Sequence, residues 1–490
     1  MRRIEYKWLV GIVFAFGMFM NLLDTTIVNV ALPTFAREFN ASATTIEWVV
    51  TAYLLALAVF IPVSGWVGDR FGTKRTFMAA LAAFTIGSLL CALSGSIHEL
   101  IAFRVLQGMG GGMLMPVGMA MVFRSFAPSE RAQAGALVSI PTAIAPAAGP
   151  VLGGYLVEYH SWHWIFLINI PVGILAITFA GLLLREERQA RPGRLDVPGF
   201  VLSATGLATL MYALAEGGTR GLDDPRVILT AIAGIALLAL FATVELRTEQ
   251  PLLDLRLFRD PLFRAVSILW IPGQAAFVGA LFLVPLLLQL EMGFTPLESG
   301  LATFPQALGV GLIAPLMGRV YPRVGPRRLV IAGMVGLLLT TLSFLRVDLE
   351  TSGWWIRLIM LLRGMSFGLV MVPASAAAYV TIAPRETGRA TAIGSAIPYI
   401  GASFGVAVAA TVLTRRLMAH GAVLVSPATR SGALLAFHDS FVVSALFPIV
   451  AIFAALLISD KRALAALRGK ERVGPAEASL AARPPEELGE

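Results

Sequence analysis

The sequence predicts an all-α integral membrane protein made of two pseudo-symmetric six-helix bundles and two inserted helices. Three observations predict this fold class: an apolar composition, fourteen apolar segments of membrane-spanning length, and a motif that occurs in both halves. Of the 490 residues, 57% are hydrophobic and 14% are charged, and the mean hydropathy is +0.79. A soluble protein could not bury this much apolar surface, so we expect lipid to surround most of the chain.

Each of the fourteen segments is long enough to cross about 30 Å of hydrocarbon, which takes roughly 20 helical residues. In chain order they span residues 8–32, 46–68, 76–97, 99–123, 133–157, 162–184, 197–215, 226–246, 263–290, 298–320, 328–346, 354–380, 389–413 and 439–459. An even number of spans places both termini on the same side of the membrane.

The lysines and arginines are distributed unequally between the two sides. The termini and the loops on their side hold 28 of these residues, and the opposite loops hold 8. By the positive-inside rule, this bias predicts cytoplasmic N- and C-termini in a multi-pass protein of the inner or plasma membrane. The first apolar segment has no small-residue cleavage site soon after a short apolar core, so we interpret it as an uncleaved span.

Two motifs are repeated between the halves. Residues 65–75 return in degraded form as 318–328, at an offset of 253, and residues 127–136 return as 383–392, at an offset of 256. The first offset also carries the first span onto the ninth, which leaves the seventh and eighth as an insertion. The predicted divisions are a bundle at 1–186, an inserted helix pair at 187–250, a second bundle at 251–460 and a disordered cytoplasmic tail at 461–490.

Asp24 is the one carboxylate that lies well inside a predicted span. Such a group costs several kcal/mol unless it is paired, hydrated or protonated, which makes it a functional candidate. At about 1.5 Å per residue, Asp24 lies about 12 Å from the outer edge and Arg104 about 8 Å, within reach of each other. We therefore expect Asp24 to carry a coupling proton while Arg104 competes for its carboxylate. The alternative is a static pair that locks two helices together.

The segments that carry a family resemblance occur in order along the chain. They are residues 23–33 (LDTTIVNVALP), 48–53, 65–75 (GWVGDRFGTKR), 104–110, 149–154, 162–173 (WHWIFLINIPVG) and 251–258 (PLLDLRLF). Together they resemble the major facilitator superfamily, and within it the fourteen-span drug:proton antiporters of the EmrB/QacA type. The resemblance covers about residue 8 to 460. It implies a major facilitator fold and solute export by alternating access.

The resemblance also assigns roles to two segments. The loop residues Gly65, Asp69, Arg70, Gly72 and Arg75 resemble a conformational lock. Its acid would contact the start of the thirteenth span, near Gly388 and Arg389, and stabilise the outward-open state. A topogenic basic loop is the plain alternative. The fifth span resembles the antiporter signature through Pro146, Gly149, Pro150 and Gly153, although Ala145 replaces a glycine of the usual pattern. Ordinary helix packing would explain its glycines, but less readily its prolines.

The second half does not repeat the Asp24–Arg104 pair. Phe277 corresponds to Asp24, and Met360 corresponds to Arg104. Proton coupling is therefore assigned to the first half. A further cation, Arg363, lies at membrane depth without a nearby carboxylate, which favours neutral or anionic lipophilic substrates over multivalent cations. Alternatively, Arg363 binds backbone carbonyls or bridges to Asp24.

Polar, aromatic and methionine side chains that could line a substrate cavity occur in both halves. The candidates are Asn21, Tyr53, Gln107, Met115, Trp270, Gln274, Gln289, Gln306 and Arg363. Each of them, taken singly, is more often a packing residue than a ligand contact.

Other functional classes are disfavoured. The pattern G-x-S-x-G at 401–405 lies in an apolar helix without a preceding strand, so we expect no enzyme. The chain has no phosphate-binding loop, one cysteine and histidines only on the outer side, so we expect no cofactor or metal. No ring of like charges or repeated filter loop suggests a channel.

The sequence therefore predicts a proton-driven exporter of lipophilic small molecules, without nucleic-acid partners. We expect a monomer, which could work with a periplasmic adaptor in a Gram-negative host. The alternatives are a transporter of the same fold dedicated to one lipid, organic acid or siderophore and, more remotely, a non-transporting sensor or scaffold.

Overall fold

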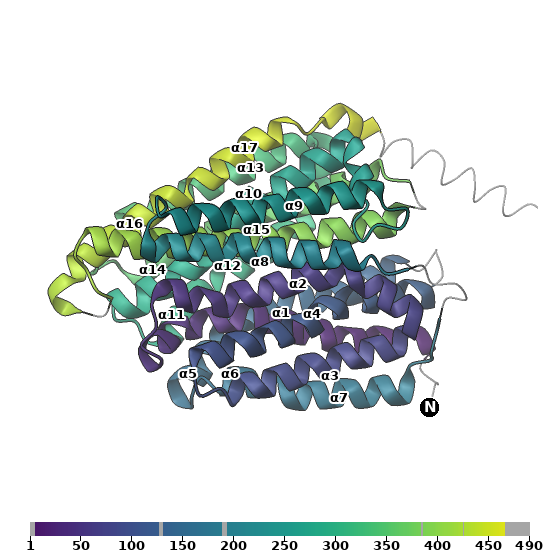
Figure 1. Cartoon of the computed structure of the whole chain (residues 1–490), viewed down its shortest axis with the longest axis horizontal. Helices are drawn as coiled ribbons and strands as arrows, with labels where there is room; N and C mark the ends of the chain where they lie inside the picture. Colours follow the sequence, from purple (N-terminus) through teal and green to yellow (C-terminus); the bar gives the residue numbers. More distant parts are fainter. Residues whose placement is uncertain (1–4, 127–130, 189–193, 384–385, 425, 466–490) are drawn as a thin grey trace, which may run out of the picture.

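The computed structural model describes residues 5–126, 131–188, 194–383, 386–424 and 426–465. Within these residues the secondary structure is helical throughout, and the long helices run side by side (Figure 1). The described ends of the chain lie at the same face of the molecule, on the right in Figure 1. We call this face the terminal side and the opposite face the far side.

The first half contains α1 (Tyr6–Glu38), α2 (Ala43–Phe71), α3 (Thr73–Ala92), α4 (Ile97–Ser125), α5 (Arg131–Tyr159), α6 (Trp164–Leu167) and α7 (Asn169–Leu183). The inserted pair is α8 (Val197–Arg220) and α9 (Pro225–Arg247). The second half contains α10 (Pro261–Leu286), α11 (Pro296–Thr303), α12 (Pro305–Val324), α13 (Pro326–Ser343), α14 (Gly353–Val380), α15 (Thr387–Ala419), α16 (Arg430–Ser444) and α17 (Leu446–Leu456).

Among the described residues, 13 helical segments are long and apolar enough to cross a membrane, with α6–α7, α11–α12 and α16–α17 each forming one segment. The remaining predicted span corresponds to α5, a helix of 29 residues. The predicted all-α membrane fold is therefore confirmed. The second repeat motif (Ala127, Pro128, Glu130 and Pro384) and tail residues 466–490 fall partly or wholly outside the described residues.

The repeated basic motif has the same local structure in both halves. Gly72 separates α2 from α3 with φ of +98°, and Gly325 separates α12 from α13 with φ of +85°. Glycine has no Cβ, so it adopts this left-handed conformation without strain. Both motifs therefore reverse the chain between two helices, which is the physical reason that their glycines recur.

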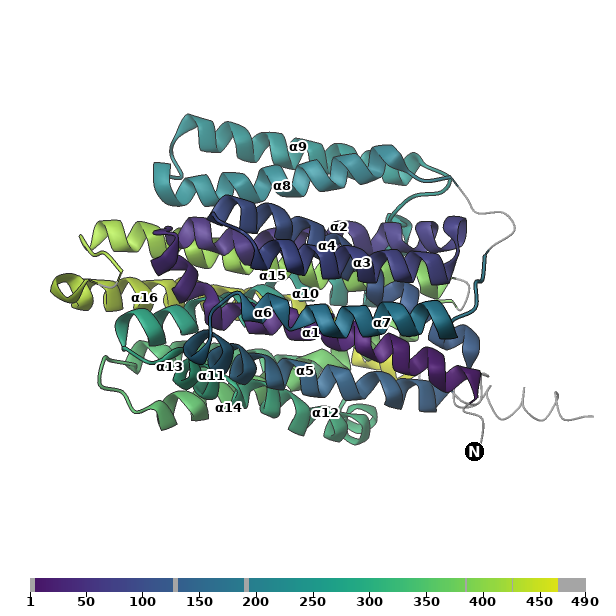
Figure 2. The same cartoon turned by 90° about the horizontal axis from the view of Figure 1, so that it is seen from below.

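The α8–α9 hairpin lies against the outside of the two halves (Figure 2). Its inner helix, α8, contacts α2 of the first half and α15 of the second. Thr411 of α15 donates a 2.8 Å hydrogen bond to the Leu214 carbonyl of α8. The inserted pair thus covers the seam at which α2 and α15 meet.

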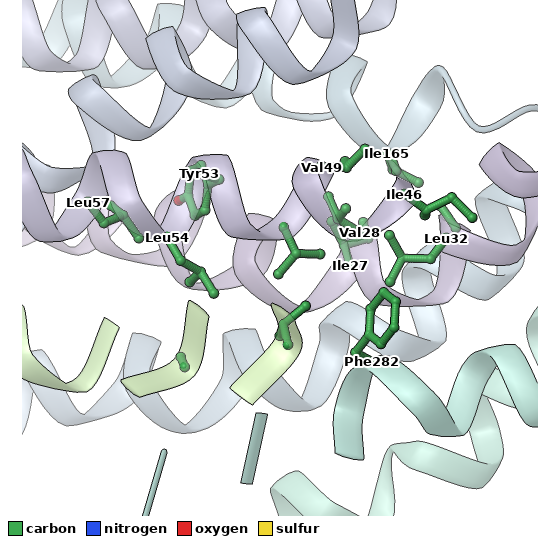
Figure 3. Close-up of a cluster of buried hydrophobic side chains, with 14 of the residues drawn as sticks. Ile27, Val28, Leu32, Ile46, Val49, Tyr53, Leu54, Leu57, Ile165 and Phe282 are labelled. Carbon is green, nitrogen blue, oxygen red and sulfur yellow. The ribbon is translucent and has the colours of Figure 1, made fainter. Parts of the chain in front are cut away.

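A buried apolar cluster joins the halves near the far side (Figure 3). Ile27, Val28 and Leu32 of α1 lie beside Ile46 and Val49 of α2, and Phe282 of α10 packs beneath them. Such burial of large side chains contributes about 1.5–3 kcal/mol for each in water, although dispersion dominates where lipid is the alternative.

Candidate functional site

Asp24 lies in the interior of the first half, on α1. Its side chain is 0% exposed and is surrounded by the buried apolar residues of that helix. The neighbouring helix α4 brings Arg104, which is 1% exposed, to the same depth. Arg104 Nη1 lies 2.5 Å from Asp24 Oδ2, so the structure pairs the two residues that the depth estimate brought together.

A network of amides surrounds this ion pair. Gln107 Nε2 donates to Asp24 Oδ1 at 2.7 Å, and Gln107 Oε1 accepts from Arg104 Nη1 at 2.6 Å. Asn169 Nδ2, on α7, lies 3.4 Å from Asp24 Oδ1. Ser88 Oγ, on α3, accepts from Gln107 at 2.6 Å and from Asn169 at 3.2 Å. Residues of α3, α4 and α7 therefore form the polar surroundings of a carboxylate on α1.

The rest of the guanidinium is also bound. Arg104 Nε donates to the Val49 carbonyl at 3.0 Å, and the Tyr53 ring centroid lies 3.9 Å from the guanidinium carbon. A buried ion pair offsets its desolvation only when further hydrogen bonds satisfy both partners, as they do here. Asp24 is therefore well satisfied as a carboxylate in this conformation, and a proton could replace Arg104 only if the pair separated.

A second polar contact lies one turn earlier on α1. The Tyr53 hydroxyl donates to Asn21 Oδ1 at 2.5 Å, and Asn21 Nδ2 donates to the Gly111 carbonyl at 3.2 Å. These contacts join α1, α2 and α4. Asn21 and Tyr53 are both buried, so in this structure they connect helices of the first half.

Helix α5, which is expected to carry the antiporter signature, packs directly against α1 near Asp24. A Cβ at Gly149 would lie 2.0 Å from Thr26 Oγ1, and a Cβ at Gly153 would lie 2.9 Å from the Ile27 carbonyl oxygen. Only glycine permits this approach, which is typical of small-residue helix contacts in membranes. Pro146 and Pro150 lie in the same helix, and the Pro150 carbonyl oxygen faces Gly300 of α11 in the other half.

The two halves are in close contact on the far side. Arg37 Nη2 donates to the Gln289 carbonyl at 2.7 Å, and Gln289 Nε2 donates to the Val30 carbonyl at 2.9 Å. Glu158 of α5 accepts from the Leu297 amide of α11 at 2.9 Å. These bonds close the path between the halves at this side of the molecule.

On the terminal side the halves are separated by a cavity of about 850 Å³. Its wall is formed by the terminal-side ends of α2, α4 and α15 and by the chain on either side of the inserted hairpin. Residues that line it include Ile61, Trp66, Asp69, Met115, Met119, Phe123, Asp196, Leu252, Gly388 and Arg389. The structure is therefore open on the terminal side and closed on the far side.

In this conformation Asp69 does not contact its predicted partner, and the contact stays a prediction for the outward-open state. Asp69 Oδ1 lies 3.5 Å from Arg124 Nη2 of α4, within the same half. Arg389 instead pairs with Asp254, at 3.0 Å. Asp69 and Arg389 both line the terminal-side cavity, but each pairs with another residue in this structure.

The other residues of the basic loop have separate roles. Glu186 accepts hydrogen bonds from the backbone amides of Lys74 and Arg75, at 3.1 Å and 3.3 Å. This contact joins the start of α3 to the chain after α7. Gly65 lies in the cavity wall with open space at its Cβ position, and Arg70 precedes the Gly72 turn.

Arg363 is the buried arginine of the second half, and its environment differs from that of Arg104. It is 0% exposed, its Nη1 donates to Thr341 Oγ1 at 2.8 Å, and its Nη2 donates to the Ala276 and Phe277 carbonyls. Phe277 is the residue that corresponds to Asp24. Of the two alternatives for Arg363, the structure therefore has the one in which the side chain binds backbone carbonyls.

The remaining cavity candidates lie in different places. Met115 lines the terminal-side cavity. Trp270 packs edge-on against Phe367 with ring centroids 6.3 Å apart, Gln274 is partly buried, and Gln306 is 4% exposed in a helix interface. Gln289 lies in the far-side contact described above. Contact between these residues and a substrate stays a prediction.

Sequence reasoning missed several polar residues. Asn169 and Ser88 join the Asp24 network. The sequence held a signal for Asn169 alone, because it lies in residues 162–173, one of the segments that carry the family resemblance. Glu47 is 0% exposed near the start of α2, where Oε2 accepts from Thr51 at 2.9 Å and Oε1 has no partner among the described residues. Glu245, near the end of α9, is buried as well, so carboxyls at the ends of spans can be buried although Asp24 is the one well inside a predicted span.

The two buried arginines should respond oppositely to replacement by methionine. Arg104→Met leaves Asp24 without its cation, and breaking such a pair costs about 3–5 kcal/mol of stability. Arg363→Met removes a charge that has no carboxylate partner, and its carbonyl acceptors lie in helix α10, so we expect stability to rise. Thermal unfolding of the two variants in detergent checks this. A lower unfolding temperature for Arg363→Met would contradict the argument.

Comparisons with known proteins agree with this architecture. Residues 14–406 match the family model of the Major Facilitator Superfamily. The chain is 37% identical over 400 residues to the Mycobacterium tuberculosis protein named multidrug resistance protein B homolog, covering 81% of this chain and 74% of that protein. It is 40% identical over 361 residues to a Salmonella paratyphi A protein provisionally named multidrug resistance protein MdtD, covering 73% and 76%.

Solved structures show the same fold. A bacterial homologue of the human lysosomal transporter Spinster superposes with a TM-score of 0.66 at 15% identity, covering 93% of this chain and 97% of that one. A D-xylose–proton symporter superposes with a TM-score of 0.65 at 16% identity, covering 94% and 99%. On these matches and on its fourteen-helix architecture, the chain belongs to the major facilitator superfamily and is a membrane transporter, not an enzyme.

Proposed function

We propose that this transporter is a proton-driven antiporter that exports lipophilic small molecules by alternating access. In this proposal Asp24 carries the proton and Arg104 competes for its carboxylate. The observation that carries the proposal is the buried Asp24–Arg104 pair, whose hydrogen-bond network joins α1, α3, α4 and α7 of one half. A charged pair in an apolar bundle is costly and is expected where it serves ion movement.

The distribution of basic residues indicates which side of the membrane the open cavity faces. If the terminal side is cytoplasmic, as the basic loops predict, this conformation is open to the cytoplasm and closed to the exterior. The ion pair then represents the state after the proton has left Asp24 for the cavity water. Reprotonation from the exterior would require the far-side contacts at Gln289 and Glu158 to open and Arg104 to withdraw from Asp24.

The cavity wall supports lipophilic cargo. Ile61, Met115, Met119 and Phe123 present apolar and adaptable side chains, which suit varied apolar shapes. The charged residues at this cavity include both acids and bases, so its charge does not select one sign of cargo. Arg363 does not line this cavity, which removes its expected influence on cargo charge here.

A bulky residue in the cavity should reduce transport of large substrates. We expect Met115→Trp to lower the efflux of bulky lipophilic compounds about 10-fold while smaller compounds are affected less, because the indole fills space between the halves. Efflux from loaded cells measures this. Leu182→Trp, on the exposed face of α7, is the matched control and should have little effect.

Proton movement is the direct test of the proposed function. The purified protein is placed in liposomes that contain a pH-sensitive dye, and a lipophilic substrate is added. Protons should then move opposite to the substrate, so the lumen becomes more alkaline where substrate enters it and more acidic where substrate leaves it. Substrate flow without proton movement would overturn the antiport. A response to a single organic acid, lipid or siderophore, but to no other compound, would favour a dedicated transporter.

A further inference from the structure

Two buried carboxyl groups meet at the base of the inserted hairpin. Asp196 caps α8, where its Oδ1 accepts the Gly199 amide at 2.9 Å, and Glu245 lies near the end of α9, where its Oε2 accepts the Leu253 amide at 3.2 Å. Asp196 is 8% exposed and Glu245 is 1% exposed. One oxygen of each carboxyl is therefore already bound to a backbone amide.

The second oxygens of these carboxyls converge on one point. Asp196 Oδ2 and Glu245 Oε1 lie 2.4 Å and 2.6 Å from the position that a Cβ of Gly199 would take. Neither oxygen has a hydrogen-bond partner among the described residues. Gly199 leaves open the space over which the two oxygens approach each other.

Within the described part of the chain, no ion pair joins Asp196 or Glu245 to a cation, although Arg194 lines the same cavity as Asp196. Asp254, in the segment after α9, adds negative charge near Glu245, and Arg389 of α15 is engaged by Asp254 at 3.0 Å. Arg256 Nη2 binds the carbonyls of Leu246 and Thr248. Among the described residues, therefore, no donor binds Asp196 Oδ2 or Glu245 Oε1, and the carboxylate of Asp254 lies nearby.

Two ionised carboxylates cannot face each other in a buried site at low cost, whereas one shared proton removes a charge and satisfies both oxygens. We propose that Asp196 and Glu245 hold one proton between them and form a second proton-binding site, separate from Asp24. When the proton leaves for water the pair carries two negative charges, and when it returns the pair carries one.

The position of the pair gives this site a route to water. Asp196 lines the terminal-side cavity, together with Gln250, Leu252 and Arg389. When the proton is lost, the two carboxylates repel each other, and this repulsion would push the start of α8 away from the end of α9. The Leu253–Asp254 segment, whose Asp254 pairs with Arg389, would move with the end of α9. The inserted hairpin would therefore respond to pH at the cavity. The transport consequence rests on the proposed function, but proton binding does not.

Infrared spectroscopy can detect the proton directly. The test uses the full-length Asp24→Asn protein in lipid, titrated over pH, with the absorption of protonated carboxyl groups as the readout. We expect Glu245→Gln and Asp196→Asn each to remove the same titrating band, because the proton is shared. Glu47→Gln, at a buried carboxyl elsewhere, is the matched control and should leave that band in place.

A band that survives both substitutions would overturn the proposal. Folding should not obscure the result, because the side-chain amide introduced by Glu245→Gln can donate to Asp196 Oδ2 in place of the proton, and thermal unfolding of each variant verifies this. As a second measurement, Glu245→Gln in the otherwise unchanged protein should shift the terminal-side pH dependence of efflux. If the Asp24→Asn protein still exports substrate uphill and still shows the titrating carboxyl band, the proton coupling proposed for Asp24 is refuted. The proton-binding site at Asp196 and Glu245 is then unaffected.

Discussion

Asp24→Asn is expected to abolish uphill export in response to a pH gradient. Asparagine retains the size of the side chain, and its one amide oxygen can still accept the hydrogen bond from Arg104, but it cannot exchange a proton. The loss should be at least about 100-fold in gradient-driven efflux from proteoliposomes, the lower range for removal of a proton-transfer group. Downhill substrate exchange, which needs no net proton movement, should persist.

Asp24→Glu is the matched control for this experiment. It retains a titratable carboxyl one methylene further from α1, so partial uphill activity should remain, at a changed pH dependence. Equal uphill activity in wild-type protein and Asp24→Asn would show that the buried pair is a structural connection between α1 and α4, and the coupling assignment would have to be abandoned.

Gly300→Ala is expected to shift the transporter away from the conformation seen here. A Cβ at Gly300 would lie 2.1 Å from the Pro150 carbonyl oxygen, which belongs to the backbone of the opposite half and cannot rotate aside. Overpacking of this kind costs about 1–3 kcal/mol. Because the contact exists only while the far side is closed, this cost changes the equilibrium by about 5- to 150-fold toward the far-side-open state.

Cysteine labelling measures that shift. Ser299 of α11 is fully buried, so Ser299→Cys should react with a membrane-impermeant maleimide faster when Gly300→Ala is present. The native Cys91 is buried and provides the blank. Gly311→Ala is the matched control, since nothing lies within 4 Å of its Cβ position. Equal labelling in the Gly300 and Gly311 variants would mean that α5 and α11 do not form the far-side closure.

Several features of the site could be predicted from the sequence because they depend on distance along a helix. Helical rise gives depth, so Asp24 and Arg104 could be assigned to the same level before their contact was known. Similarly, the repeated glycines predicted matching turns, and the structure has them at Gly72 and Gly325. Helix number and length followed from apolar runs, since the hydrocarbon thickness sets a minimum length.

Other features depend on how each helix is rotated about its axis. Ser88 and Asn169 lie in apolar segments, and nothing local shows that both face Asp24. The position of Arg363 against the Phe277 carbonyl likewise depends on how α14 packs on α10. The contact predicted for Asp69 depends on conformation instead, since it belongs to a state that is closed on the terminal side.

The sequence by itself determined that this is a membrane protein of repeated halves with a buried acid and a base at matching depth, because burial in lipid restricts composition and length so strongly. Only the tertiary structure decided which side is open, which amides complete the Asp24 network and that Asp196 meets Glu245. Those facts depend on contacts between segments distant in sequence, and small rotations or shifts of packed helices change them without altering any local pattern.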